Sequence, residues 1–236
     1  IPFIMNRDKP SPPALHSRDA WIQASRFHDL NDADILSEVK ARVTRHIDAR
    51  PVVLLDLDST LYEVGPRTHE ILREWARNPS SREFEEVRKR LDALSPARVG
   101  YSLRDTFLAA GLDLTRPEVL AAWNSAKDFW NRRFFTNQYL DHDHAYPGAA
   151  QFVQELYKLG AELIYLTGRD EPNMGEGTRS RLKKDGFPWG VERTHLLMKA
   201  AANLDELSHK VEAAHFVRGK GKLIASFENE PKNVAA

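Results

Sequence analysis

Two aspartates separated by a single residue, Asp56 and Asp58, are the side chains of this 236-residue chain best suited to chemistry. Carboxylates this close repel one another unless a proton or a cation lies between them. A hard divalent cation prefers oxygen ligands, and magnesium is bound by a few carboxylates together with waters and phosphate. The pair therefore indicates a magnesium site, although an isolated pair of this kind is as often a turn with two solvated acids.

Two more polar clusters occur directly after apolar runs. Thr167, Gly168 and Arg169 follow the run 163–166, and Glu228 and Asn229 follow the run 223–227. In an open parallel sheet, ligands bind beyond the carboxyl ends of the strands. If these runs are neighbouring strands, the three clusters converge on one site, which argues against a simple turn at the aspartate pair.

The elements around these clusters indicate an α/β fold. The run 52–55 is continuous, apolar and rich in β-favouring residues, which suits a strand buried on both faces. Later elements are predicted to alternate between helix and strand, at 147–159, 163–166, 178–185, 195–198, 204–218 and 223–227. Strands that alternate with helices predict a mainly parallel sheet.

Two other parts of the chain are predicted to be helical. Residues from about 11 to 50 show helical spacing of apolar residues after a proline-rich start. Residues 62–144 contain no comparable strand run, and their helices are predicted at 70–77, 81–94, 102–110 and 117–135. We therefore expect a helical N-terminal extension at 1–50, an α/β core at 51–61 and 145–236, and an inserted all-helical block at 62–144.

The three clusters resemble sequence motifs of the haloacid dehalogenase-like (HAD) superfamily. Residues 53–61 are similar to its first motif, and residues 163–169 are similar to its second, a strand that ends in threonine or serine. Residues 227–231 stand where the fourth, acidic motif belongs, although Glu-Asn-Glu departs from the usual aspartates. The resemblance covers about 51–236 and implies a Rossmann-like three-layer core, with the helical block acting as a cap.

The resemblance implies a role for each residue of the first two motifs. Asp56 would attack phosphorus and form an aspartyl-phosphate, and Asp58 would act as general acid and base. Thr167 would donate a hydrogen bond to a phosphoryl oxygen, with Gly168 and Arg169 also at the phosphate. A salt bridge at the strand end is an equal alternative for Arg169. An acid at position 58 favours phosphoryl transfer over dehalogenation, because a departing halide needs no proton.

The resemblance also implies a magnesium ion and a lysine that neutralises charge around the nucleophile. The ion would be held by the carboxylate of the first aspartate, the backbone carbonyl of the second, and Glu228 or Asn229, and both of the last two are kept as candidates. Lys210 is preferred for the lysine because it precedes Glu228 on the predicted helix before the last strand. Lys199 is the alternative, and for either lysine a solvated surface charge is the simpler interpretation.

Two groups of residues at the helical block have both a structural and a functional interpretation. The segment 141–144 is Asp-His-Asp-His, but its spacing suits no standard zinc site, so it is predicted to be a polar linker. One stretch holds five aromatic residues, Trp123, Phe129, Trp130, Phe134 and Phe135. We expect them to form the core of the block. The alternative is that one ring faces the substrate together with Arg132 or Arg133.

Composition excludes several classes of function. Acidic and basic residues balance at 34 each, so no charge excess indicates a nucleic acid or a membrane as partner. The chain has no cysteine, which excludes disulfides and thiolate metal sites. No apolar run approaches the roughly 20 residues that span a bilayer. We expect a cytoplasmic protein with a small phosphorylated substrate. A removed signal peptide and the oligomeric state are left open.

The predicted function is magnesium-dependent hydrolysis of a phosphomonoester. One alternative is a phosphotransferase or a nucleic-acid end phosphatase that uses the same chemistry. The other is a binding or scaffold protein with a decayed site, which the unusual fourth motif supports and the intact aspartate pair opposes. The identity of the substrate cannot be read from the sequence, since it depends on residues of the helical block.

Overall fold

The computed structural model describes residues 31–230, and its centre is a four-stranded parallel sheet. β1 (Pro51–Leu55) lies between β4 (Glu162–Asp170) and β6 (Lys222–Phe227), and β5 (Thr194–Lys199) extends the sheet beyond β4. All three neighbouring pairs are parallel, in the order β5-β4-β1-β6. The predicted α/β fold with a parallel sheet is therefore confirmed.

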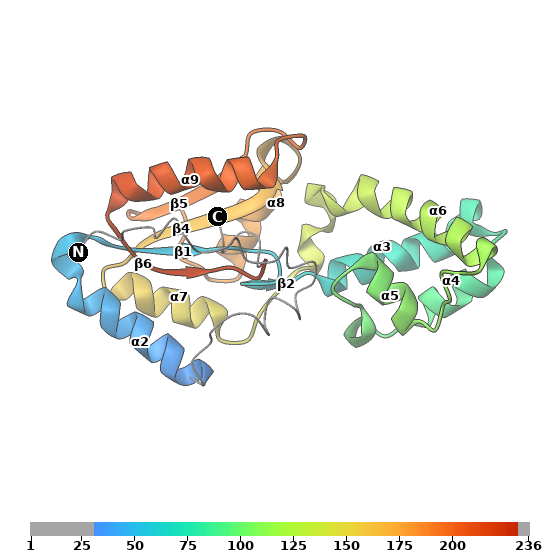
Figure 1. Ribbon diagram of the computed structural model, residues 1–236, viewed down its shortest axis with the longest axis horizontal. Helices are drawn as coiled ribbons and strands as arrows, with labels where there is room; N and C mark the ends of the chain where they lie inside the picture. The colour runs from blue at the N-terminus through green and yellow to red at the C-terminus, as the bar shows by residue number, and fades with distance from the viewer. Residues whose placement is uncertain (1–30, 231–236) are drawn as a thin grey trace, which may run out of the picture.

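Helices cover both faces of this sheet (Figure 1). They are α2 (Asp32–Arg45), α7 (Ala149–Lys158), α8 (Glu171–Lys184) and α9 (Glu206–Lys220). Val217 of α9 packs with Val52 of β1 on one face, whereas Val53 and Leu55 belong to a cluster with residues of α2, α7 and α8 on the other. Neighbouring residues of a strand point to opposite faces, so two covered faces require the continuous apolar run of β1.

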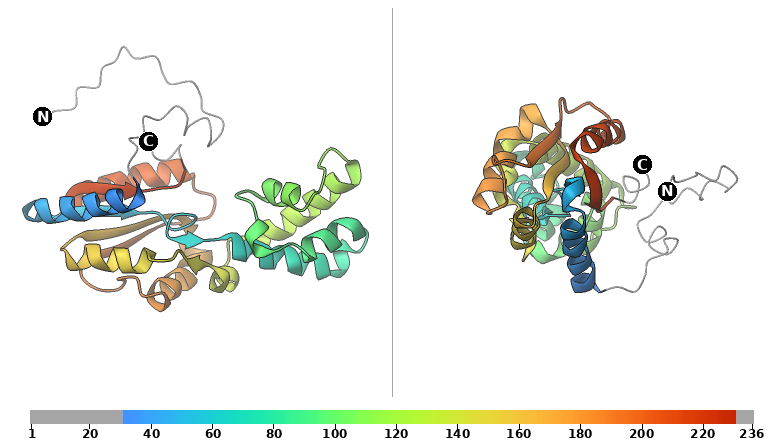
Figure 2. Two further views of the ribbon diagram at one scale, coloured as in Figure 1. Left: turned by 90° about the horizontal axis from the view of Figure 1, so that it is seen from below. Right: turned by 90° about the vertical axis from the view of Figure 1, so that its left-hand side faces the viewer.

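The rest of the described chain is a helical lobe that leaves the sheet after β1 and returns before α7 (Figures 1 and 2). Its helices are α3 (Gly65–Arg77), α4 (Glu85–Asp92), α5 (Leu103–Ala109) and α6 (Pro117–Phe134). Its own hydrophobic cluster includes Ile71, Trp75, Phe107 and Phe129. β2 (Tyr62–Glu63) pairs antiparallel with β3 (His144–Ala145), so the outgoing and returning segments are held together.

Several element boundaries differ from those expected from the sequence. β4 runs to Asp170 instead of ending near residue 166, and α8 begins at Glu171 instead of near 178. The cause is a helix cap, because the side chain of Asp170 accepts a hydrogen bond from the backbone N–H of Asn173. The first described helix starts at Asp32, and the helical residues expected at 11–30 lie outside the described part of the chain. Within residues 31–230, no helix combines the length and the apolar character that a bilayer span requires.

Candidate active site

The three polar clusters meet at one edge of the sheet because β1 lies between β4 and β6. Asp56 directly follows β1, and its backbone N–H donates to the carbonyl of Phe227, 3.0 Å away, at the end of β6. Thr167 is fully buried in the last part of β4. In the register of the sheet Leu55 lies opposite Tyr165 on one side and Phe227 on the other, so the polar residues that follow these three lie side by side.

Asp56 is almost fully buried, with 7% of its surface exposed. The hydroxyl of Thr60 donates to its Oδ2 at 3.1 Å, and the Nζ of Lys210 lies 3.5 Å from its Oδ1. The pKa of Asp56 is raised to about 7, chiefly by burial. The negative charges of Glu228 and Asp58 also raise it, whereas the charge of Lys210 and the hydrogen bond from Thr60 act in the opposite direction. In the absence of a metal, the nucleophile candidate is therefore held close to the point where it takes up a proton.

The two lysine candidates have different surroundings. Lys210 projects from α9 and forms ion pairs with both Asp56 and Glu228. Lys199, at the end of β5, donates to two backbone carbonyls of the loop that follows, both at 3.0 Å. Only the first of these positions neutralises charge directly at the nucleophile, which favours Lys210 for the motif-three role.

Asp58 is held between two arginines. Its Oδ1 accepts from the Nη2 of Arg67 at 2.8 Å and from the Nη2 of Arg169 at 2.6 Å, and its Oδ2 accepts from the Nε of Arg169 at 3.0 Å. Burial by itself would raise the pKa of this carboxyl, but the two guanidinium groups more than offset it and hold the pKa well below its usual range. This arrangement favours the ionised form of Asp58.

A fourth charged residue, Asp143, completes this group. Its carboxylate accepts from Nε and Nη2 of Arg67, both at 2.8 Å, and from Nη2 of Arg169, also at 2.8 Å. Asp143 and the two arginines are all at most 2% exposed. The four residues come from the loop after β1, from α3, from the segment before β3 and from β4. The network, which we call the junction network, therefore ties the helical lobe to the sheet at both crossings.

The junction network bears on two expectations from the sequence. The segment 141–144 is not only a polar linker, because Asp143 is one of its residues and is fully buried. The guanidinium group of Arg169 donates hydrogen bonds to Asp58, Asp143 and Thr178. This corresponds to the salt-bridge alternative at the strand end. Neither Arg67 nor Asp143 was identified from the sequence. A buried Arg67 in the first turn of a charged helix leaves no local signal there.

Asn229 faces two of the oxygen atoms that the family resemblance assigns to magnesium. One atom of its side-chain amide lies 3.1 Å from the backbone oxygen of Asp58 and 3.2 Å from Oδ2 of Asp56, while the other lies 3.1 Å from the hydroxyl of Tyr101. If the amide nitrogen faces the two oxygens, it donates to both. If the amide oxygen faces them, three oxygens converge with separations close to the ~3.0 Å expected between adjacent ligands of an octahedral magnesium ion. These groups therefore fit the ion.

Glu228, the other metal candidate, is already engaged. Its carboxylate pairs with Lys210 and accepts from the backbone N–H of Glu230 at 2.9 Å. Across the described residues, no group of three or more acidic, histidine or cysteine side chains is placed to hold a metal ion. A magnesium site at this edge would thus rest on the carboxylate of Asp56, the carbonyl of Asp58 and the amide of Asn229.

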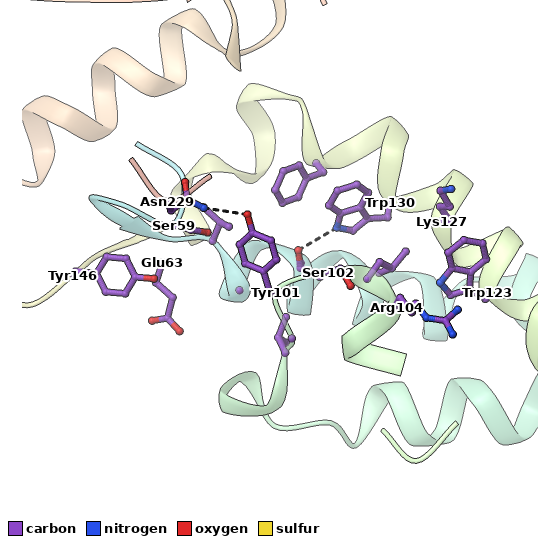
Figure 3. A pocket seen from close by; sticks show the side chains of 17 residues that line it. Ser59, Glu63, Tyr101, Ser102, Arg104, Trp123, Lys127, Trp130, Tyr146 and Asn229 are labelled. Atoms are coloured by element: carbon purple, nitrogen blue, oxygen red, sulfur yellow. Dashed lines mark hydrogen bonds between the residues drawn. The ribbon is translucent and has the colours of Figure 1, made fainter. Parts of the chain in front are cut away.

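Two connected hollows open beside these residues. The inner one, of about 380 Å³, is lined by Asp56, Lys210 and Gly168 among others. The outer one, of about 550 Å³, runs along the helical lobe (Figure 3). The two hollows are adjacent, because both are lined by Ser59, Val64, Tyr101, Phe134 and Asn229.

The aromatic residues divide between the two roles considered from the sequence. Phe129 is buried in the core of the lobe. Trp123, Trp130 and Phe134 pack partly against that core and also line the outer cleft. Phe135 lines the inner hollow. The aromatic stretch is therefore both the core of the lobe and one wall of the cleft.

The arginines proposed to accompany these rings do not line the cleft. Arg133 pairs with Glu74 at 3.1 Å and stacks on a ring of the lobe core, and Arg132 does not line either hollow. The basic residues that line the outer cleft are Arg104 and Lys127. They were missed because neither lies next to a motif, and only the folded lobe, in which α5 and α6 share one hydrophobic cluster, shows which side chains reach the cleft.

The chain is similar to known proteins in both sequence and structure. A family model described as haloacid dehalogenase-like hydrolase matches residues 51–223. A protein of Bacillus cereus named "Putative nucleotidase" is 26% identical over 153 residues, which are 65% of this chain and 76% of that protein. A crystal structure of a "Putative Phosphatase" from Clostridium difficile is 14% identical, with a TM-score of 0.45 and coverage of 75% of this chain and 74% of the other. The family match contains the first two polar clusters and the whole helical lobe.

Proposed function

The chain belongs to the haloacid dehalogenase-like hydrolase family, and on this basis we propose that it hydrolyses phosphomonoesters through an aspartyl-phosphate on Asp56. The prediction of a hydrolase is confirmed by the family. The observation that carries the finer proposal is the meeting of Asp56, Thr167, Lys210 and Asn229 at one edge of the sheet, beside a hollow of about 380 Å³. A nucleophile, a hydroxyl donor, a cation and a set of oxygen ligands are the parts that phosphoryl transfer requires.

In the first step, a carboxylate oxygen of Asp56 attacks phosphorus and the leaving-group oxygen departs with a proton. Asp56 must be ionised to attack, and Lys210 favours the ionised form. Magnesium, when bound through Asp56, the carbonyl of Asp58 and Asn229, supplies positive charge that offsets repulsion between the nucleophile and the substrate. In the second step, water hydrolyses the acyl phosphate and restores Asp56.

Asp58 is proposed as the group that protonates the leaving group and then activates the water. A carboxylate held between two guanidinium groups is unprotonated and also a weak base, so this role requires that the clamp be loosened. Arg67 belongs to α3 of the lobe, whereas Arg169 belongs to β4 of the sheet. We propose that movement of the lobe withdraws Arg67 and lets Asp58 exchange a proton.

Residues 62–144 are proposed to act as a cap that closes over the site and shapes the choice of substrate. Its helices carry one wall of the outer cleft, and Tyr101 from the lobe already contacts Asn229 from the core. Closure of such a cap excludes water and strengthens the electrostatic interactions inside the site. Because its relative in Bacillus cereus is named a nucleotidase, nucleoside monophosphates are the first substrates to test.

The proposal is tested by hydrolysis of an aryl phosphate with and without magnesium. We expect turnover only with the metal, and Lys210→Met should lower kcat by about 100-fold or more, since a cation at the nucleophile is removed. Lys199→Met is the matched control and should stay within a few-fold of the wild type. Equal losses for the two lysines would contradict the assignment. No turnover of any phosphomonoester would support the alternative of a binding or scaffold protein.

Analysis of the reaction products and of substrate preference distinguishes a hydrolase from a phosphotransferase and from a nucleic-acid end phosphatase. Release of inorganic phosphate to water alone supports the hydrolase, and transfer to an added alcohol supports a phosphotransferase. A preference for the ends of oligonucleotides over mononucleotides would support a nucleic-acid end phosphatase.

A further inference from the structure

The outer cleft has two ends of different chemistry. Ser59 and Asn229 lie at the end next to the sheet, and Arg104, Lys127 and Trp123 are grouped at the far end, with Tyr101 and Trp130 between them (Figure 3). Of the described residues that line this cleft, the one carboxylate is Glu63, which lies beside Tyr146 near the sheet end. The far end therefore offers hydrogen-bond donors and positive charge without an acidic counterpart.

The basic residues at the far end have no carboxylate partner within the described part of the chain. The ammonium group of Lys127 lies 4.7 Å from the centre of the Trp123 ring, and both Lys127 and Arg104 are exposed. Several other arginines of the lobe are paired with carboxylates, such as Arg77 with Asp92 at 2.8 Å and Arg133 with Glu74 at 3.1 Å. Arg104 and Lys127 are thus two cations that line the same hollow without a carboxylate partner among the described residues.

The indole of Trp123 supplies a second, independent observation. Its buried N–H has no hydrogen-bond acceptor within the described residues. The other tryptophans of the lobe each have one, because Trp130 donates to the hydroxyl of Thr68 at 3.1 Å and Trp75 donates to Ser125 at 3.2 Å. A buried donor without an acceptor is rare in folded proteins, and this one belongs to a ring that lines the outer cleft.

We propose that the leaving group of the substrate carries a second anionic group, which Arg104 and Lys127 bind at the far end of the outer cleft. This inference rests on the proposed phosphomonoester hydrolysis, because it places the scissile phosphoryl group in the inner hollow. The middle of the leaving group crosses the faces of Tyr101 and Trp130, which suits a flat or apolar body. The substrate class is therefore a two-headed one, a phosphomonoester with a distant carboxylate or second phosphate.

The test uses aryl phosphates that differ in one charge. Phenyl phosphates are extended by methylene chains of increasing length that end in a carboxylate or, as the uncharged isostere, in a carboxamide. At the best chain length we expect kcat/KM for the carboxylate to exceed that for the carboxamide by about tenfold, because two charged donors bind it. A parallel series that ends in a phosphonate distinguishes a preference for carboxylate from a preference for a second phosphate group.

Variants of the two basic residues test whether they cause the preference for the carboxylate over the carboxamide. Arg104→Ala and Lys127→Ala should each lower the carboxylate-to-carboxamide ratio several-fold, and Arg104→Lys should restore part of it. Lys89→Ala, an exposed lysine of α4 that lies outside the cleft, is the matched control and should leave the ratio unchanged. Equal kcat/KM for carboxylate and carboxamide at every chain length would overturn the proposal. An unchanged carboxylate-to-carboxamide ratio in the double variant Arg104→Ala/Lys127→Ala would also overturn it.

The same comparison works if the proposed function fails. Phosphonate analogues of the two series cannot be hydrolysed, and their binding to the wild-type protein can be measured by calorimetry in the presence of magnesium. Tighter binding of the carboxylate form, weakened in the two variants, supports the far-end site even if no phosphate ester is turned over. Equal binding of charged and uncharged forms refutes it, whether or not the protein is a phosphatase.

Discussion

Among residues 31–230, charged side chains are paired with one another at the edge of the sheet, whereas those at the far end of the outer cleft are not. At the sheet edge, Asp56 pairs with Lys210, and Asp58 is held by Arg67 and Arg169. At the far end of the cleft, two cations lack such partners in the described chain. Matched buried charges strongly favour one geometry, because breaking a pair costs free energy. Cationic donors that lack a partner and line a hollow can instead pair with an anionic group of a ligand. The comparison suggests that the sheet edge determines the reaction and the lobe determines the substrate.

The largest effect is expected from removal of the proposed nucleophile at the sheet edge. Asp56→Asn should lower kcat by a factor of at least about 10⁴, because an amide cannot attack phosphorus. The fold should persist, since the amide fills the same space and reduces repulsion at the site. Steady-state kinetics with an aryl phosphate and a circular dichroism spectrum measure both effects. Asp92→Asn, on the surface of α4, is the control, and near-full activity of Asp56→Asn would refute the mechanism.

The next largest effect is expected on the free energy of unfolding, when a residue of the junction network is replaced. Asp143→Ala removes a buried partner of two arginines, which should lower the free energy of unfolding by about 3–5 kcal/mol. Arg77→Ala removes an exposed ion pair with Asp92 in the same lobe and should cost no more than about 1 kcal/mol. Urea unfolding of both variants provides the measurement. Similar losses would show that the buried network is no more important than a surface pair.

The two metal candidates can be separated by calorimetric titration with magnesium in the absence of substrate. Asn229→Ala should weaken binding by about tenfold or more, because it removes a proposed oxygen ligand. Glu228→Gln should have a smaller effect, since this carboxylate is engaged by Lys210. A larger loss for Glu228→Gln would move the ligand from the amide to the carboxylate and would contradict the geometry proposed for Asn229.

The smallest effect concerns the pH dependence of metal-free stability. The pKa of Asp56 is raised to about 7 from the ordinary value of 3.8, so the folded protein holds this proton more tightly than the unfolded chain. The stability from this group is complete below about pH 4 and is lost as the pH rises through about 7. With a chelator present, the Tm of Asp56→Asn should therefore exceed that of the wild type by more at pH 8 than at pH 5. A difference that is constant across this range would exclude buried titration of Asp56.

Much of the core was readable from the sequence because its signals are local. An uninterrupted apolar run such as 52–55 indicates a strand covered on both faces, and a polar cluster at its end marks the edge where ligands bind. The alternation of strands and helices predicted the parallel sheet, and the motif around Asp56 predicted the family. Lys210 was preferred from its place before the last strand, and its contact with Asp56 agrees with that preference.

The junction network and the polarity of the cleft were decided only by the tertiary structure. Arg67 and Asp143 are 76 residues apart in the chain and lie in segments that look like ordinary charged surface. Nothing local distinguishes a solvated arginine from one that is buried against Asp58, because the difference depends on which helix packs over it. Arg104 and Lys127 likewise reach one hollow only because α5 packs near α6.

The sequence by itself determined the order of the elements, the position of the proposed nucleophile and the class of reaction to expect, since these depend on runs of a few residues. The tertiary structure decided how each charge is partnered. It placed Asp56 and Asp58, two residues apart, in environments that shift their pKa values in opposite directions. The physical reason is that the free energy of a buried charge depends on the groups within a few ångströms of it, and most of those groups come from distant parts of the chain.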